Sequence, residues 1–202
     1  EDCEPPLLGY RASLAAGHIP ALRRYWTERH YLTGPVPGGI TFDDYIDDGD
    51  RSVTAFLATY GHLAALQLAH ALGAPWDTYT ATQAVWFGRL DILQWAIARG
   101  CPGADEICTT AAAAGRLAIM QWARAQVPPC RWDERTCVAA VRNGHLDILQ
   151  WADAHLCPRS GYSCTHAARN GHLAVLQWVR GEGCPWDAYT CSDAAAGGHL
   201  EI

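Results

Sequence analysis

The apolar residues of the chain recur in short groups whose spacing is that of one face of an α-helix. In the stretch "GHLDILQWADAH", which begins at Gly144, the apolar positions include Leu146, Ile148, Leu149 and Ala152. Residues three and four positions apart share a helix face, so this stretch predicts a helix with one buried side. The same pattern recurs from Gly171 onward in "GHLAVLQWVRGEG".

A turn and a second helix follow each such helix, as the stretch "GCPWD" from Gly183 illustrates. Gly183 can end the first helix, and Pro185 cannot continue it. Asp187 or Thr190 can then cap the next helix, whose sequence "TCSDAAAG" is rich in alanine. These small side chains allow a neighbouring helix to approach closely. The predicted unit is therefore a helix, a tight turn, a second helix and a short loop.

This unit is repeated along the chain, and a Gly-(His/Arg)-(Leu/Ile) tripeptide marks each copy. The tripeptide begins at Gly17, Gly61, Gly88, Gly115, Gly144, Gly171 and Gly198, and the spacings after Gly61 are 27, 27, 29, 27 and 27 residues. One helix pair cannot bury its apolar face alone, whereas stacked pairs share a continuous core. The sequence thus predicts an all-α fold, a solenoid of stacked helix-turn-helix units in which apolar helix residues such as Leu173 are buried.

The repeat resembles the ankyrin repeat, whose usual form is T-P-L-H-x-A-A-x-x-G-H, a second apolar helix and then G-A-D. The matching positions are Thr190, Ala194, Ala195, Gly198 and His199 in the last unit and Leu173, Val175, Leu176 and Gly183 in the helix before it. Ankyrin units usually have about 33 residues, and the residues missing here fall where ankyrins carry a β-hairpin finger. The resemblance, closest to the short ankyrin-like arrays of giant DNA viruses and some protists, implies ankyrin-like repeats that lack these fingers.

The resemblance divides the chain into three parts. Residues 1–30 are expected to form an N-terminal ankyrin-like repeat, residues 31–50 an inserted loop rich in Pro, Gly and Asp, and residues 51–202 the remaining repeats, the last of them truncated. The acidic residues of the insert lack the spacing of a calcium-binding loop. We expect the natural protein to continue with further units, because the apolar end of a solenoid needs a polar cap.

Composition narrows the possible functions. The net charge of −6 argues against a nucleic-acid partner, and no apolar run reaches the roughly 18 residues of a membrane span. The chain has no lysine, which excludes lysine-based catalysis within it. Because no H-E-x-x-H, G-x-S-x-G or dinucleotide-binding motif is present either, we expect no enzymatic activity, no cofactor and no small-molecule substrate.

Cysteine is the strongest candidate for chemistry. Four units contain C-x6-C, at Cys101/Cys108, Cys130/Cys137, Cys157/Cys164 and Cys184/Cys191. In the unit of Gly61 both positions are alanine, which suggests that the two side chains of one unit touch. Three interpretations remain open: a zinc site, although zinc usually takes C-x2–4-C pairs; a disulfide within each unit; and small buried thiols, which the alanine-containing unit favours.

Two other repeated side chains have structural explanations. Histidine follows the marker glycine at His18, His62, His145, His172 and His199, but Arg89 and Arg116 take its place in two units. Since arginine neither ligates zinc nor acts as a base, we expect a hydrogen-bond donor here, not a metal site. The tryptophans of the Gln-Trp pairs, Trp95, Trp122, Trp151 and Trp178, are expected to pack between units and not to stack on nucleic-acid bases.

Positions that vary between units are free to serve function. In the alanine-rich helices, the candidate partner-binding residues are Thr82, Gln83, Trp86, Thr109, Thr110, Arg142, His166, Arg169 and Asp193. The ankyrin resemblance implies that these helices line a concave face that binds proteins.

The sequence therefore favours a non-enzymatic scaffold or adapter that binds a partner protein inside a cell, in the cytoplasm of a host. The alternative is a structural, cementing component of a viral particle. An enzyme or a redox-active metal protein is the least favoured hypothesis.

Overall fold

The computed structural model describes residues 53–158, 161, 163–185 and 188–202, so the expected repeat of residues 1–30 and the insert of residues 31–50 lie outside it. The described part is all-helical: it contains eleven α-helices, one short 3-10 helix and no strand. The helices are α3 (Val53–Tyr60), α4 (Leu63–Ala71), α5 (Thr78–Trp86), α6 (Leu90–Ala98), η2 (Ala104–Glu106), α7 (Ile107–Ala114), α8 (Leu117–Arg124), α9 (Glu134–Asn143), α10 (Leu146–Ala154), α11 (Ser163–Arg169), α12 (Leu173–Gly181) and α13 (Ala188–Gly197).

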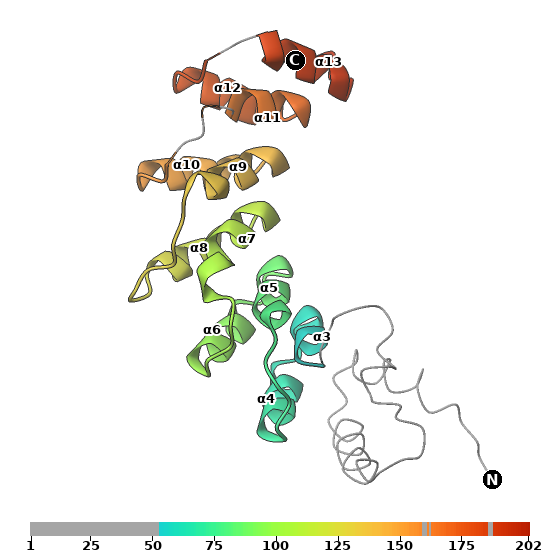
Figure 1. The fold of residues 1–202 in the computed structure, drawn as a ribbon, viewed down its shortest axis with the longest axis vertical. Coiled ribbons are helices and arrows are strands. Elements are labelled where there is room, and N and C mark those ends of the chain that lie inside the picture. The colour runs from blue at the N-terminus through green and yellow to red at the C-terminus, as the bar shows by residue number, and fades with distance from the viewer. Residues whose placement is uncertain (1–52, 159–160, 162, 186–187) are drawn as a thin grey trace, which may run out of the picture. The chain divides into compact units, whose positions relative to one another are not determined.

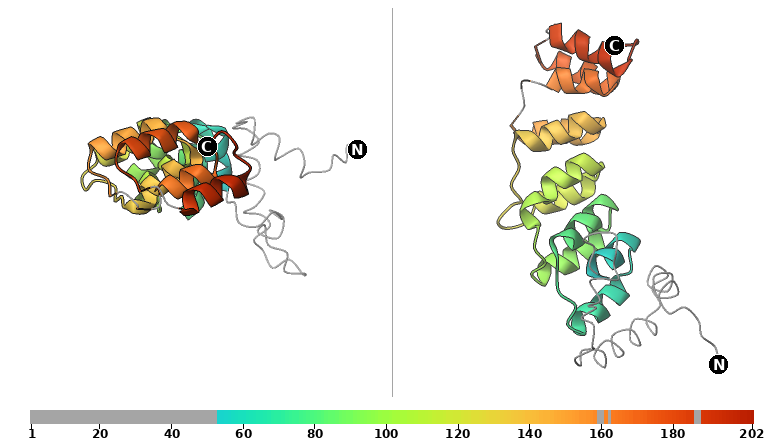
Figure 2. Two further views of the ribbon diagram at one scale, coloured as in Figure 1. Left: turned by 90° about the horizontal axis from the view of Figure 1, so that it is seen from above. Right: turned by 45° about the vertical axis from the view of Figure 1, so that its right-hand side comes forward.

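The chain divides into two compact units, with the boundary in the sequence between Gly103 and Ala104. In the first, α3 packs against both α4 and α5, and α5 packs against α6. In the second, α7, α9, α11 and α13 lie side by side in chain order, and α8, α10 and α12 each pack on the helix that precedes them (Figures 1 and 2). We call α3, α5, α7, α9, α11 and α13 the first helices and α4, α6, α8, α10 and α12 the second helices. Each unit is thus built from repeated helix pairs, and no described helix is long and apolar enough to cross a membrane.

Small side chains on the first helices allow this close packing. Ala84, Ala111, Ala140 and Ala167 are each almost fully buried. Larger side chains fill the core from the second helices, for example Leu93 of α6. The predicted division between alanine-rich first helices and bulkier second helices is therefore confirmed.

Leu173 was expected to be buried in the core, and this expectation is wrong. This residue begins α12 and is 37% exposed, whereas Val175 and Leu176 of the same helix are buried. The equivalent leucines Leu90 and Leu146 are half-buried at the start of their own helices. The first position of the second helix therefore lies at the margin of the core, where its side chain is covered only in part.

Aspartate caps the first helices where the repeat provides it. Asp77 accepts a hydrogen bond from Thr80 N at 2.7 Å, and Asp133 forms a capping box with Thr136. The threonine is thus the partner of the cap, and Thr190 accordingly lies buried inside α13. Asp187 itself lies outside the described residues.

The marker glycine and the histidine of the next unit form the junction between successive helix pairs. Gly144 has a φ of +77°, and His172 lies so close that a Cβ at Gly144 would be 2.7 Å from the imidazole Nδ1. His172 Nε2 lies 2.9 Å from the carbonyl oxygen of Arg142, and the same contact joins His145 to Ala113 and His199 to Arg169, each at 3.2 Å. Because a carbonyl only accepts, Nε2 must donate the proton. The expected donor role is confirmed for these three histidines, whereas the buried Nε of Arg89 has no hydrogen-bond partner in the described part of the chain.

Two of the four tryptophans of the Gln-Trp pairs, Trp95 and Trp151, pack against a tryptophan of the turn that leads in from the preceding helix pair. The ring centroids of Trp76 and Trp95 are 5.6 Å apart, and those of Trp132 and Trp151 are 5.8 Å apart. Arg124 lies over the Trp132 ring at 4.1 Å. These contacts join the turn before one first helix to the second helix that follows it.

The corrected core gives a matched pair of substitutions. Leu176→Ala should lower the free energy of unfolding by about 2–5 kcal/mol, because it empties a buried site. Leu173→Ala, in the same helix, should lower it by about 1 kcal/mol or less, because its side chain is partly exposed. Urea denaturation followed by circular dichroism measures both values. Equal losses would contradict the placement of Leu173.

The glycine–histidine junction gives a second pair. Gly144→Ala and Gly183→Ala both place a β-carbon on a residue with positive φ, which costs about 1–2 kcal/mol, but nothing lies within 4 Å of the new Cβ at Gly183. At Gly144 the new Cβ also displaces His172, so its loss should be larger by about 1 kcal/mol or more, as for an overpacked contact. Thermal unfolding of the two variants tests the difference. An equal loss of stability would show that the contact with His172 adds nothing to the cost of the substitution.

Candidate protein-binding surface

Four of the predicted partner-binding residues come together on the first helices of the second unit. Arg142 is in the last turn of α9, His166 and Arg169 are on α11, and Asp193 is on α13. We call these four residues the α9–α13 cluster. Both arginines are exposed, whereas His166 and Asp193 are half-buried. Neither guanidinium has an ion-pair partner in the part of the chain that the structure describes, so both charges are available to a ligand.

Charge interactions within the α9–α13 cluster are visible at His166. Burial is the main cause that lowers the pKa of this imidazole, and the nearby positive charges of Arg142 and Arg169 lower it further. Asp193 opposes the shift. His166 is therefore neutral at neutral pH, and the positive charge of the cluster comes from its two arginines.

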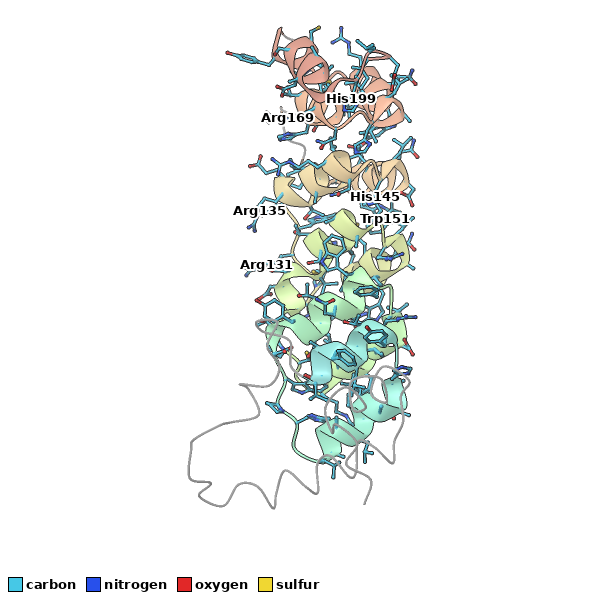
Figure 3. All side chains as sticks on the ribbon, turned by 90° about the vertical axis from the view of Figure 1, so that its right-hand side faces the viewer. Arg131, Arg135, His145, Trp151, Arg169 and His199 are labelled. Atoms are coloured by element: carbon cyan, nitrogen blue, oxygen red, sulfur yellow. The ribbon has the colours of Figure 1, made fainter. Side chains whose placement is uncertain are left out.

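The histidine junctions fix the helix ends that carry these arginines. The backbone carbonyls of Arg142 and Arg169 accept hydrogen bonds from His172 and His199. Figure 3 shows Arg169 along one edge of this unit together with Arg131 and Arg135, whereas His145, Trp151 and His199 lie toward the opposite edge. His199 thus holds the backbone carbonyl of Arg169, while Arg169 lies toward the opposite edge of the unit.

Thr109 and Thr110, on α7, contribute less surface. Both are half-buried, and Thr109 Oγ1 lies 3.1 Å from Thr136 Oγ1 on α9. That hydrogen bond joins two first helices, as the 2.9 Å bond between Thr80 and Thr54 does in the first unit. Thr109 therefore has a structural partner already.

In the first unit the three predicted residues lie on α5 but differ in exposure. Gln83 is buried, and its Oε1 accepts a hydrogen bond from Thr59 on α3 at 3.3 Å. Thr82 is half-buried, and its hydroxyl donates to Thr78 O at 3.1 Å. Trp86 is 44% exposed and offers the largest surface of the three.

Trp86 belongs to a group of exposed aromatic residues that sequence reasoning identified only in part. Tyr60, Tyr79 and Phe87 are also exposed, each by more than two fifths. Tyr60 and Phe87 are 27 residues apart and precede the marker glycines Gly61 and Gly88. The repeat spacing itself therefore contained the signal that could have found Tyr60.

The cysteine contacts differ from the expected pairing within one unit. None of the eight described cysteines forms a disulfide. Cys108 N–H donates to Cys130 Sγ at 3.3 Å, and Cys164 N–H to Cys184 Sγ at 3.2 Å. The contacts thus join the second cysteine of one sequence repeat to the first cysteine of the next repeat. The reason is that the turn before each first helix lies against the start of the preceding first helix.

Metal binding and the comparisons give no further assignment. The described residues contain no group of three or more His, Cys, Asp or Glu side chains that could hold a metal ion. The sequence matches no protein-family model, and it has no significant match among curated proteins.

The α9–α13 cluster predicts the titration of His166. Its pKa should lie below the usual value near 6.5. Replacing both Arg142 and Arg169 with glutamine should raise the pKa by removing two positive charges, whereas Asp193→Asn should lower it further. Imidazole proton shifts followed by NMR between pH 4 and 8 measure the three values. An unchanged pKa in the double variant would show that the arginines lie too far from His166 to affect it.

Proposed function

We propose that this chain is a non-enzymatic protein-interaction scaffold, built from short ankyrin-like repeats that stack as a solenoid. It binds a partner protein along the exposed side of its first helices. In the second unit the α9–α13 cluster makes contact with an acidic segment of the partner, and in the first unit Trp86 supplies an aromatic contact.

One observation carries the proposal. Ala113, Arg142 and Arg169 occupy equivalent positions, and each contributes its backbone carbonyl to a histidine junction. Their side chains have no part in that hydrogen bond. Side chains at this position can therefore change from unit to unit without loss of the junction, which leaves them free to determine which partner binds.

The chemistry of the exposed side chains supports a protein partner. Arginine and tryptophan are the residue types enriched at binding hot spots. A guanidinium binds carboxylates through paired hydrogen bonds, and two of them on neighbouring helices suit an extended acidic segment better than a small molecule.

Binding should depend on the first helices and not on the second. The combined variant Trp86→Ala, Arg142→Ala and Arg169→Ala should weaken the free energy of binding to the partner by about 2 kcal/mol or more, the scale of a hot spot. This corresponds to a roughly thirtyfold higher Kd. Its helical content and cooperative melting should stay close to those of the wild type. The partner is first captured with the wild-type chain and identified by mass spectrometry, and calorimetry then gives both affinities.

The matched control replaces two other exposed arginines, Arg99 and Arg180, which follow or end second helices. Arg99→Ala with Arg180→Ala should leave the affinity unchanged within about threefold. The wild-type affinity should also fall as salt is raised, because exposed charges are screened. The proposal would be overturned if the affinity were unchanged in the Trp86, Arg142 and Arg169 variant but fell in the Arg99 and Arg180 variant.

A further inference from the structure

Cys108 and Cys130 are brought together by two successive helix pairs. Cys108 is the second residue of α7, and Cys130 lies in the turn before α9. Cys130 Sγ accepts a hydrogen bond from Cys108 N at 3.3 Å, which brings the two residues into contact. Cys130 is partly exposed, whereas Cys108 is buried. Cys130 is thus the member of the pair that offers some surface to a reagent.

From this arrangement we propose that Cys108 and Cys130 form an oxidation site, at which a hydroperoxide oxidises the Cys130 sulfur and Cys108 then closes a disulfide between successive helix pairs. No part of the proposed scaffold function requires this chemistry, so the two stand independently.

The surroundings of Cys130 favour its thiolate. The Cys130 sulfur accepts a hydrogen bond from the N–H of Cys108 in the first turn of α7, where the positive end of the helix attracts a negative charge. Arg124 Nη1 donates to the Cys130 carbonyl oxygen at 2.7 Å and places a second positive charge nearby. The hydrogen bond from the Cys108 thiol, together with the Cys108 backbone N–H and Arg124, lowers the pKa of Cys130 to about 7, although burial and Asp105 oppose the shift.

The pair Cys137 and Cys157 is the natural control, because it occupies the same positions as Cys108 and Cys130 in the next sequence repeat. Cys157 is buried, and its thiol donates to Asp133 O at 3.6 Å, just as the Cys130 thiol donates to the equivalent carbonyl oxygen of Ala104 at 3.4 Å. Asp153 stands at the position of Arg124. The hydrogen bond with Cys137 and burial raise the pKa of Cys157, and the charge of Asp133 raises it further. Contact between two thiols is thus common to both pairs, whereas exposure and a nearby cation are not.

The proposed reaction consumes one hydroperoxide for two thiols. The Cys130 thiolate attacks one peroxide oxygen, the O–O bond breaks, and with hydrogen peroxide the leaving hydroxide takes a proton to become water. Cys130 is now a sulfenic acid, oxidised by two electrons. The Cys108 sulfur gives up its proton and attacks the Cys130 sulfur, the S–O bond breaks, and a second water leaves. Two thiols and one hydrogen peroxide therefore give one disulfide and two waters.

The test treats the full 202-residue chain, freshly reduced, with one molar equivalent of hydrogen peroxide at pH 7. Remaining thiols are alkylated, and tryptic peptides are mapped without reduction. Cys130 falls in the peptide 125–131, but Cys101 and Cys108 share the peptide 100–116. A Cys101→Ala background removes that ambiguity. The control pair falls in the separate peptides 136–142 and 143–159.

We expect the disulfide between peptides 100–116 and 125–131 to form in at least tenfold higher yield than the disulfide of the control pair, and to disappear with dithiothreitol. In Cys108→Ser, Cys130 should accumulate as a sulfenic acid that dimedone traps. In Cys130→Ser, Cys108 should stay reduced. Circular dichroism confirms that each variant is folded before treatment.

Three results would overturn the proposal. The first is equal yield from the control pair, which would mean that the charge and exposure around Cys130 do not matter. The second is oxidation of Cys130 to acids beyond the sulfenic state with no link to Cys108. The third is oxidation of Cys108 in the Cys130→Ser variant, which would show that Cys108 reacts directly.

Discussion

The hydrogen bond from a histidine to a carbonyl of the preceding helix pair is the contact on which the arrangement of the second unit depends. His145, His172 and His199 each extend back over a marker glycine to the end of a first helix. A helix C-terminus leaves carbonyl groups without partners inside the helix. The histidine satisfies one of them and joins two helix pairs at the same time. Glycine is needed beneath it both for the positive φ and for the close approach of the ring.

Much of this fold could be predicted from the sequence because its signals are local and repeated. Helix positions follow from apolar spacing, and helix ends follow from Gly183 and its equivalents. One exception is Leu156, which has a φ of +63° where three other repeats have Gly73, Gly100 and Gly183. Its side chain is almost fully exposed, so no packing contact opposes the strained backbone. Only comparison of the units, and no local rule, marks that position.

The exposure of individual side chains was harder to predict. Gln83 and Trp86 are both variable positions on α5, yet one is buried against Thr59 and the other is exposed. Variation between units says only that a residue type is not required, and a glutamine can satisfy a local hydrogen bond in a single unit. Leu173 shows the opposite case, since a repeated leucine at a helix start lies only at the margin of the core.

The cysteine pairs could not be paired from the sequence because their contact depends on the register between successive helix pairs. Spacing within one unit suggested Cys130 with Cys137, whereas packing places Cys130 against Cys108. This register also explains why some positions of the repeat tolerate a change of side chain and others do not. At the position of Arg142 the fold uses only the backbone, so a change of side chain alters the surface and leaves the junction intact. At Cys130 and Cys157 the side chain itself makes the contact between successive helix pairs, and a nearby charge, Arg124 in one case and Asp133 in the other, alters the pKa of the thiol. The same repeated geometry therefore yields a reactive thiol, Cys130, in one sequence repeat and an unreactive thiol, Cys157, in the next.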